Sequence, residues 1–267
     1  MLACDIDHTL LPYKGQISDQ DKTSLQELHR RGVTVVLATG RATTSTQLIL
    51  NRIFTEERPD YLICYNGSQV LDVKRNENLV YRTIDPTTVA ELSAWCRENG
   101  AWLQGYEEGG FVVEQDTSYV RAYAESSGMG YTVVADLAEY LLPKGGTPKL
   151  VCHDVQERLV HHDKALREIS NGRWTVVTSM PIFLELLPPD TNKGTAVRAL
   201  AEHLSYSLEE VVAVGDNLND VEMIQRVGMG VAVANAVPEL KAVASGVTER
   251  DEFNSAVTEV IQRYFAK

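Results

Sequence analysis

Residues 33–41 read Val-Thr-Val-Val-Leu-Ala-Thr-Gly-Arg, a nearly continuous apolar run that ends in a hydroxyl, a glycine and an arginine. A continuous run fits a β-strand whose two faces are both covered by helices. Similar runs occupy residues 2–6 and 61–65, and segments with helical periodicity separate the three runs at residues 19–31 and 43–54. The first 80 residues therefore predict a β-α-β-α-β series with a parallel sheet.

The pattern of predicted helices and strands changes near residue 83. A predicted helix is followed by a hairpin whose strands flank Glu107-Glu108-Gly109-Gly110, and further strands surround a second helix (helices 86–99 and 156–169; strands 102–106, 111–115, 149–153, 174–178 and 183–187). The doubly wound pattern returns after Pro188-Pro189 (helices 194–203 and 220–227; strands 211–214 and 230–233). We predict an α/β, Rossmann-like core with a doubly wound parallel sheet, formed by residues 1–82 and 189–267, and an inserted α+β cap formed by residues 83–188.

Composition narrows the range of partners. The 267 residues carry a formal net charge of −12 and no basic run, which argues against binding to nucleic acid or to acidic membranes. Four widely spaced cysteines form no CxxC pair and predict buried free thiols. Because the sequence also shows no signal peptide and no long apolar stretch, we expect a cytoplasmic protein. We further expect a monomer or a small homo-oligomer.

Two carboxylates stand at the end of the first predicted strand, in Asp5-Ile6-Asp7-His8-Thr9. Crowded carboxylates repel each other and favour either a divalent cation or a shared proton. An Asp-x-Asp pair alone is more often a loop cap or a solvated turn, but ligands of parallel sheets bind at the carboxyl ends of the strands. Its position therefore favours a functional site.

Two further segments suggest an anion site. Thr39-Gly40-Arg41 joins a strand end to a helix start, where a hydroxyl and main-chain N–H groups can bind phosphate, although a simple helix cap is an equal alternative. Lys193 opens a helix, where a positive charge opposes the helix dipole unless an anion lies nearby. A solvated surface lysine is the alternative.

A third cluster follows residues 211–214 and reads Gly215-Asp216-Asn217-Leu218-Asn219-Asp220. Oxygen ligands on a tight turn suit Mg²⁺, whereas the glycine and terminal glutamate of a calcium loop are absent at their required spacing. A structural turn with an Asp cap is the alternative. All of these segments fall at strand ends or at the helix starts that follow them, so the sequence predicts one shared site.

These motifs, in this order, resemble the haloacid dehalogenase superfamily, whose phosphatases carry Asp-x-Asp-x-Thr, a strand-end Thr or Ser, a Lys and a Gly-Asp-x-x-x-Asp turn. The position of the insertion, together with Tyr65-Asn66-Gly67-Ser68 and Val233-Ala234-Asn235-Ala236, resembles the Cof-type branch. The likeness covers nearly the whole chain and is weaker inside the insertion.

The resemblance implies a phosphatase of small phosphorylated metabolites such as sugar phosphates. In it Asp5 attacks phosphorus and becomes an aspartyl phosphate, and Asp7 protonates the leaving oxygen and then activates water. An Asp5 oxygen, the Asp7 carbonyl and Asp216 would hold Mg²⁺, with Asp220 supporting the metal or Lys193. The remaining implied roles are phosphate binding by Thr39, Gly40 and Lys193 and substrate contact by Asn219 and Arg41.

The sequence departs from the branch at three positions. His8 stands where Gly is common, and Asp251 and Ser255 stand where an Asn and a Gly are usual. Two other functions stay open at this level: a phosphotransferase or phosphomutase that uses the same aspartyl phosphate, and a non-catalytic regulatory protein of the same fold.

Overall fold

The computed structural model describes residues 1–54, 59–180 and 183–266. The chain divides into two compact units. The first comprises Met1–Gly40, Gln47–Val80 and Asn192–Lys267, and the second comprises Arg41–Thr46 and Tyr81–Thr191. No helix in the described ranges combines the length and apolar character needed to cross a membrane.

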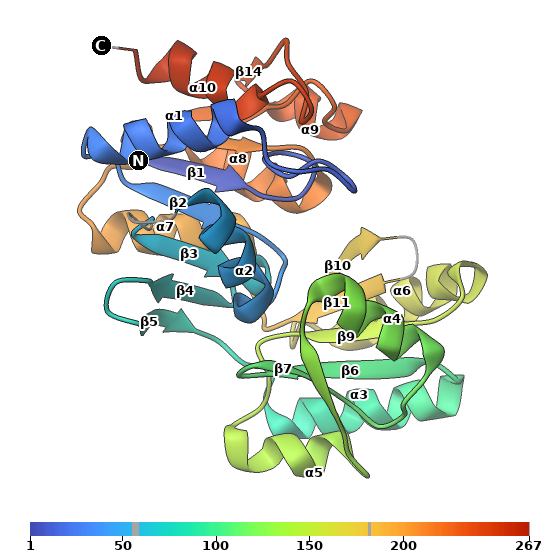
Figure 1. Ribbon diagram of the computed structural model, residues 1–267. Helices are drawn as coiled ribbons and strands as arrows, with labels where there is room; N and C mark the ends of the chain where they lie inside the picture. The colour runs from blue at the N-terminus through green and yellow to red at the C-terminus, as the bar shows by residue number, and fades with distance from the viewer. Residues whose placement is uncertain (55–58, 181–182, 267) are drawn as a thin grey trace. The chain divides into compact units, whose positions relative to one another are not determined.

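The first unit is built on an eight-stranded sheet with the order β14-β13-β12-β1-β2-β3-β4-β5 (Figure 1). Neighbouring strands from β14 to β3 pair in parallel, whereas β4 runs antiparallel to β3. The bounds are β1 Leu2–Asp5, β2 Val35–Ala38, β3 Tyr61–Cys64, β4 Gln69–Asp72, β5 Glu77–Tyr81, β12 Val212–Gly215, β13 Met229–Ala232 and β14 Gly246–Val247. The predicted parallel core is confirmed, and the antiparallel β4 is an addition that the sequence patterns did not indicate.

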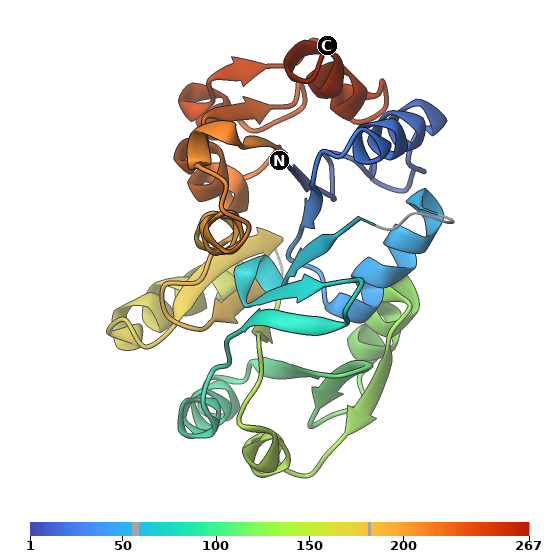
Figure 2. The same cartoon turned by 90° about the vertical axis from the view of Figure 1, so that its left-hand side faces the viewer.

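Helices cover both faces of this sheet. Helices α1 and α10 pack together on one face, and α7 and α8 pack together on the other (Figure 2). The bounds are α1 Asp19–Arg30, α2 Thr43–Ile53, α7 Lys193–His203, α8 Val221–Arg226, α9 Pro238–Val243 and α10 Ala256–Tyr264; of α2, only the residues from Gln47 onward belong to the first unit. All four residues of β1 and of β2 are buried, as the continuous apolar runs predicted.

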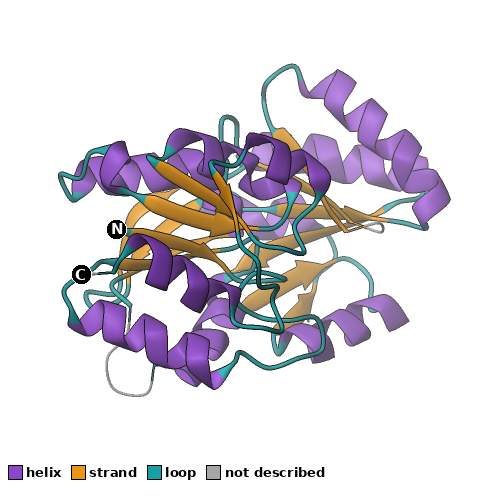
Figure 3. Ribbon diagram, turned by 90° about the horizontal axis from the view of Figure 1, so that it is seen from above, coloured by secondary structure: helices purple, strands orange, loops and turns teal. Residues whose placement is uncertain are grey.

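The second unit contains a six-stranded sheet with the order β10-β11-β9-β6-β7-β8. Leu92, Leu141 and Leu166, from three helices, share one apolar core with Leu150 and Leu184 of the strands. Figure 3 distinguishes the helices from the strands by colour. The bounds are α3 Pro86–Asn99, β6 Trp102–Glu107, β7 Gly110–Val113, α4 Ser118–Ser127, β8 Gly130–Val133, α5 Leu137–Leu141, β9 Leu150–His153, α6 Gln156–Ser170, β10 Thr175–Met180 and β11 Phe183–Leu187.

The predicted hairpin is the antiparallel pair β6–β7, which is confirmed. The four cysteines are buried free thiols, also as predicted. The elements that sequence patterns did not indicate are β4, β5, α4, β8, α5, α9, β14 and α10, most of which are short or largely exposed.

Candidate active site

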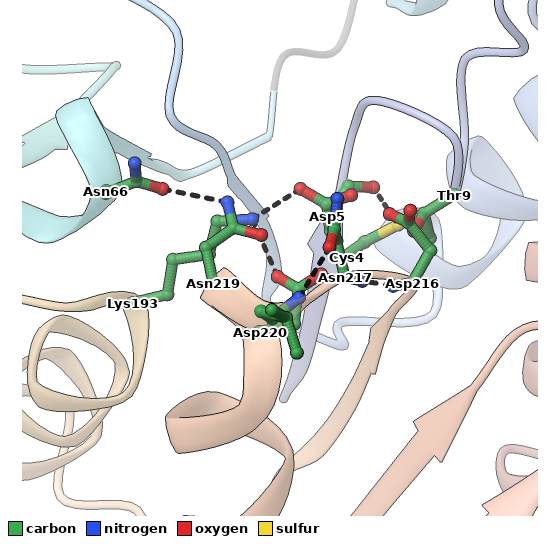
Figure 4. Close-up of polar contacts among 10 residues, drawn as sticks. Cys4, Asp5, Thr9, Asn66, Lys193, Asp216, Asn217, Asn219 and Asp220 are labelled. Atoms are coloured by element: carbon green, nitrogen blue, oxygen red, sulfur yellow. Dashed lines mark hydrogen bonds and ion pairs between the residues drawn. The ribbon is translucent and has the colours of Figure 1, made fainter. Parts of the chain in front are cut away.

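The site lies where three neighbouring strands of the first unit end. Strands β12, β1 and β2 are adjacent and parallel, so their carboxyl ends meet at one edge of the sheet. Asp5 is the last residue of β1, Thr39 directly follows β2, and Asp216 directly follows β12. The structure therefore brings together residues that are far apart in the sequence (Figure 4).

Three buried carboxylates form the centre of this edge. Asp5, Asp216 and Asp220 each offer a carboxylate oxygen within 4.8 Å of the others. The Thr9 hydroxyl donates to Asp216 Oδ1 at 3.0 Å. Asp220 Oδ2 accepts hydrogen bonds from the main-chain N–H groups of Asp216, at 3.0 Å, and Asn217, at 3.1 Å. These contacts fix the loop after β12 around the acidic cluster.

Lys193, the first residue of α7, lies inside the cluster. Its ammonium donates to Asp5 Oδ1 and to Asp220 Oδ1, both at 2.6 Å, and the side chain is only 1% exposed. The lysine predicted to need an anion at the helix start thus has two carboxylates as partners. The cluster thus contains one positive charge and three acidic groups, two of which contact the ammonium.

The electrostatics show an excess of negative charge. Burial raises the pKa of Asp5 well above its ordinary value, the charge of Asp220 adds to this rise, and Lys193 opposes it. Burial, with the charge of Asp220, raises the pKa of Asp216 from 3.8 to about 6. Burial disfavours the charged form of Lys193, but its two carboxylate partners outweigh that effect and raise the pKa of the ammonium.

The cluster fits a divalent cation such as Mg²⁺. Carboxylate oxygens are the ligands that this hard cation prefers, and one or two from the protein suffice. Burial is the main cause of the raised pKa of Asp5 and Asp216, and a bound cation would offset the carboxylate repulsion that adds to it. Asp7 lies two residues beyond Asp5 and forms an isolated bridge with Leu11; its predicted contact with a metal through the main-chain carbonyl stays a prediction.

The remaining predicted residues lie as follows. Thr39 is fully buried, and its N–H donates to the carbonyl of Ile63 at 2.9 Å. Gly40 follows it in the first unit. Arg41 falls in the second unit, where its guanidinium donates to the Ser45 hydroxyl at 3.2 Å, so its substrate contact stays a prediction.

Asn219 contacts Asn66, a residue to which the sequence patterns assigned no role. Its Nδ2 donates to Oδ1 of Asn66 at 3.0 Å, and Asn66 is 2% exposed. The available signal was an Asn-Gly pair directly after the predicted strand 61–65, because Asn tolerates the left-handed backbone that such turns require. Thr9, whose hydroxyl holds Asp216, was likewise given no separate role.

The departures at His8 and Ser255 share a backbone conformation. Both residues are left-handed, with φ of 62° and 63°, the region that glycine adopts without steric cost. His8 Nδ1 lies 3.5 Å from Glu252 Oε1, and the His8 ring stacks on the Tyr13 ring. The Ser255 hydroxyl lies 2.8 Å from that of Ser18.

Comparisons with known proteins support the same assignment. The family model of the haloacid dehalogenase-like hydrolases matches residues 2–261. An HMP-PP phosphatase of Escherichia coli O157:H7 is 30% identical over 243 residues, which cover 91% of this chain and 86% of that protein.

Two solved structures are similar over nearly their whole length. A crystal structure from Thermotoga maritima has a TM-score of 0.86 and 30% identity, and the match covers 98% of this chain and 96% of that one. A haloacid dehalogenase-like hydrolase from Bacteroides thetaiotaomicron has a TM-score of 0.87 and 27% identity, with 98% of each chain covered. With its parallel-sheet core, strand-end acidic cluster and these matches, the chain belongs to the haloacid dehalogenase-like hydrolases and is an enzyme of their phosphatase class.

Proposed function

We propose that the protein is a Mg²⁺-dependent phosphatase that hydrolyses small phosphate monoesters through an aspartyl phosphate on Asp5. The observation that carries the proposal is the meeting of Asp5, Lys193, Asp216 and Asp220 within one buried cluster. Such a cluster combines a nucleophile, a fixed positive charge and a set of oxygen ligands.

The chemistry proceeds in two displacements at phosphorus. In the first, an Asp5 oxygen forms a bond to phosphorus while the ester oxygen leaves and takes a proton from Asp7. In the second, Asp7 takes a proton from water, the water oxygen attacks phosphorus, and the bond to Asp5 breaks to release phosphate. Splitting the reaction in this way lowers each barrier.

Positive charge is needed throughout, because phosphoryl transfer depends on positioning and electrostatic stabilisation. Mg²⁺, held by oxygens of Asp5, Asp216 and the Asp7 carbonyl, would neutralise charge on the phosphoryl oxygens. Asp220 holds the Lys193 ammonium 2.6 Å from its own Oδ1 and thereby keeps it beside Asp5. In this proposal the hydroxyl of Thr39 and the main-chain N–H of Gly40 complete the phosphate site.

The substrate class is a small phosphorylated metabolite. Support comes from the Escherichia coli relative, which is named an HMP-PP phosphatase. In the proposal the inserted residues 83–188 select the leaving group, nucleic acid is no partner, and the protein works in the cytoplasm as a monomer or small homo-oligomer. The net charge of −12 is consistent with a small ligand bound by local groups rather than a polyanion bound over a wide surface.

The test compares wild-type protein with Asp5→Asn on p-nitrophenyl phosphate and on a panel of sugar phosphates, with Mg²⁺ or with EDTA. Asp19→Asn is the matched control, because that carboxylate is 98% exposed. We expect turnover in wild type and control only when Mg²⁺ is present, and none in Asp5→Asn, whose fold is verified by a cooperative unfolding transition well above the assay temperature. Undiminished turnover by folded Asp5→Asn would rule out the proposed nucleophile.

A further inference from the structure

One turn of the first unit contacts three of the segments that build the acidic site. It comprises Tyr65, Asn66 and Gly67, follows β3 directly, and is buried throughout. Its backbone is unusual, because all three residues have positive φ, of 51°, 52° and 106°. Left-handed backbone at consecutive residues is costly for side chains with a Cβ and persists only where the surroundings enforce it.

The first contact is with the phosphate turn after β2. The main-chain N–H of Asn66 donates to the carbonyl of Thr39 at 2.9 Å, while the N–H of Thr39 donates to Ile63 at 2.9 Å. A Cβ added at Gly40 would lie 3.0 Å from Asn66 Nδ2, closer than an ordinary contact. The Asn66 side chain therefore packs directly over the Thr39-Gly40 backbone.

The second contact is with the loop after β12. Asn66 Oδ1 accepts a hydrogen bond from Asn219 Nδ2 at 3.0 Å across 153 residues of sequence (Figure 4). Asn219 lies between Asp216 and Asp220, so this bond ties the acidic loop to the phosphate turn through a single buried amide. Breaking a hydrogen bond between buried amides costs free energy. The bond therefore favours one relative position of the two segments.

The third contact is with the start of α7. A Cβ added at Gly67 would lie 2.3 Å from the carbonyl oxygen of Asn192, so this close approach requires glycine. Asn192 is the N-cap of α7 and precedes Lys193, whose ammonium joins Asp5 and Asp220. The turn therefore contacts Asn192, the residue that caps the start of α7 and directly precedes Lys193.

We infer that Asn66 is a positioning residue of the active site: it sets the spacing between the phosphate turn at Thr39-Gly40 and the acidic loop by holding Asn219. The inference rests on the proposed function, because the spacing matters only if phosphate binds between these segments. Asn66 acts through Asn219 and need not touch the reacting atoms. Displacements of about 1 Å in such sites can reduce rates about 100-fold.

The discriminating variant is Asn66→Gly, which removes the amide but keeps the positive φ that this position needs. The matched control is Asn76→Gly, since Asn76 also has a positive φ, of 55°, but is exposed in the turn between β4 and β5. Asn219→Ala and the double variant Asn66→Gly/Asn219→Ala complete a double-mutant cycle. Each protein is first checked for a cooperative unfolding transition well above the assay temperature.

Two quantities are measured in all five proteins: kcat/KM for p-nitrophenyl phosphate with Mg²⁺, and the affinity for inorganic phosphate by calorimetry. We expect Asn66→Gly to lose about 10- to 100-fold in kcat/KM and to bind phosphate more weakly, with Asn76→Gly unchanged. The double variant should be no worse than Asn219→Ala, because both changes break one linkage.

Equal kcat/KM for Asn66→Gly and Asn76→Gly, or losses that multiply in the double variant, would overturn the positioning role while leaving the phosphatase proposal intact. Absence of wild-type turnover would instead refute the proposed function. In that case phosphate affinity alone decides the positioning role, and a wild-type protein that does not bind phosphate contradicts it.

Discussion

Asp216→Asn should stabilise the metal-free protein. Burial and the charge of Asp220 raise the folded-state pKa of Asp216 from 3.8 to about 6. A carboxyl whose pKa is raised by folding contributes stability below its unfolded pKa and loses that contribution as pH rises through the folded value. At pH 7.5 the ionised group therefore destabilises the metal-free fold, and an asparagine avoids this cost.

The magnitude follows from the shift. A rise of about 2 pKa units lowers the free energy of unfolding by about 3 kcal/mol when the folded-state carboxyl is fully ionised. At pH 5 the folded-state carboxyl is mostly protonated, so the cost is roughly half as large. The asparagine Oδ1 can still accept the hydrogen bond that the Thr9 hydroxyl makes to Asp216 Oδ1 at 3.0 Å. The variant therefore removes a charge without leaving that hydroxyl unpaired.

The assay is urea unfolding in EDTA at pH 7.5 and pH 5, repeated with Mg²⁺ at pH 7.5. We expect the variant to be more stable than wild type in EDTA, with a smaller gap at pH 5, and Mg²⁺ to stabilise wild type much more than the variant. Asp220→Asn is the contrasting control, because Asp220 accepts from Lys193 and two main-chain N–H groups and its loss should destabilise. A metal-free Asp216→Asn protein less stable than wild type at pH 7.5 would refute the reasoning.

Three further outcomes are expected. Lys193→Met should lower stability by about 3–5 kcal/mol and abolish turnover, since Asp5 and Asp220 lose their shared ammonium at 2.6 Å; an unchanged urea midpoint would contradict this. Mg²⁺ affinity measured by calorimetry should fall by up to about tenfold per pH unit below about 6, as Asp216 takes up a proton, and a pH-independent affinity would exclude that carboxylate as a ligand. His8→Gly should retain turnover and change stability by no more than about 1 kcal/mol, because relief of the 62° φ offsets lost contacts with Glu252 and Tyr13; a loss as large as that of Asp5→Asn would give His8 a direct role.

The parallel core was predictable because its strands are buried on both faces and therefore read as continuous apolar runs. Strand ends could then be located, and with them Asp5, Thr39 and Asp216, since each stands at or within two residues of the end of an apolar run. The exposed strand β8 and the short helix α9 lack such runs, and neither was predicted. Local pattern thus gives the sheet and the positions of its polar ends.

Contacts between distant segments could not be predicted from local sequence patterns. Asn66 and Asn219 are 153 residues apart, and Thr9 and Asp216 are 207 apart. Neither pair has a spacing or periodicity that would mark it, because each forms only when the strands assemble. The sharing of Lys193 between Asp5 and Asp220 likewise depends on where α7 begins relative to the sheet.

The most direct test of the account is to stop turnover of a phosphate monoester with acid and to map the modified residue by peptide mass spectrometry. The wild-type protein with Mg²⁺ should carry one phosphoryl group on Asp5, labile to mild base, and Asp5→Asn should carry none. A phosphoryl group on another residue, or wild-type turnover by Asp5→Asn, would contradict Asp5 as the nucleophile.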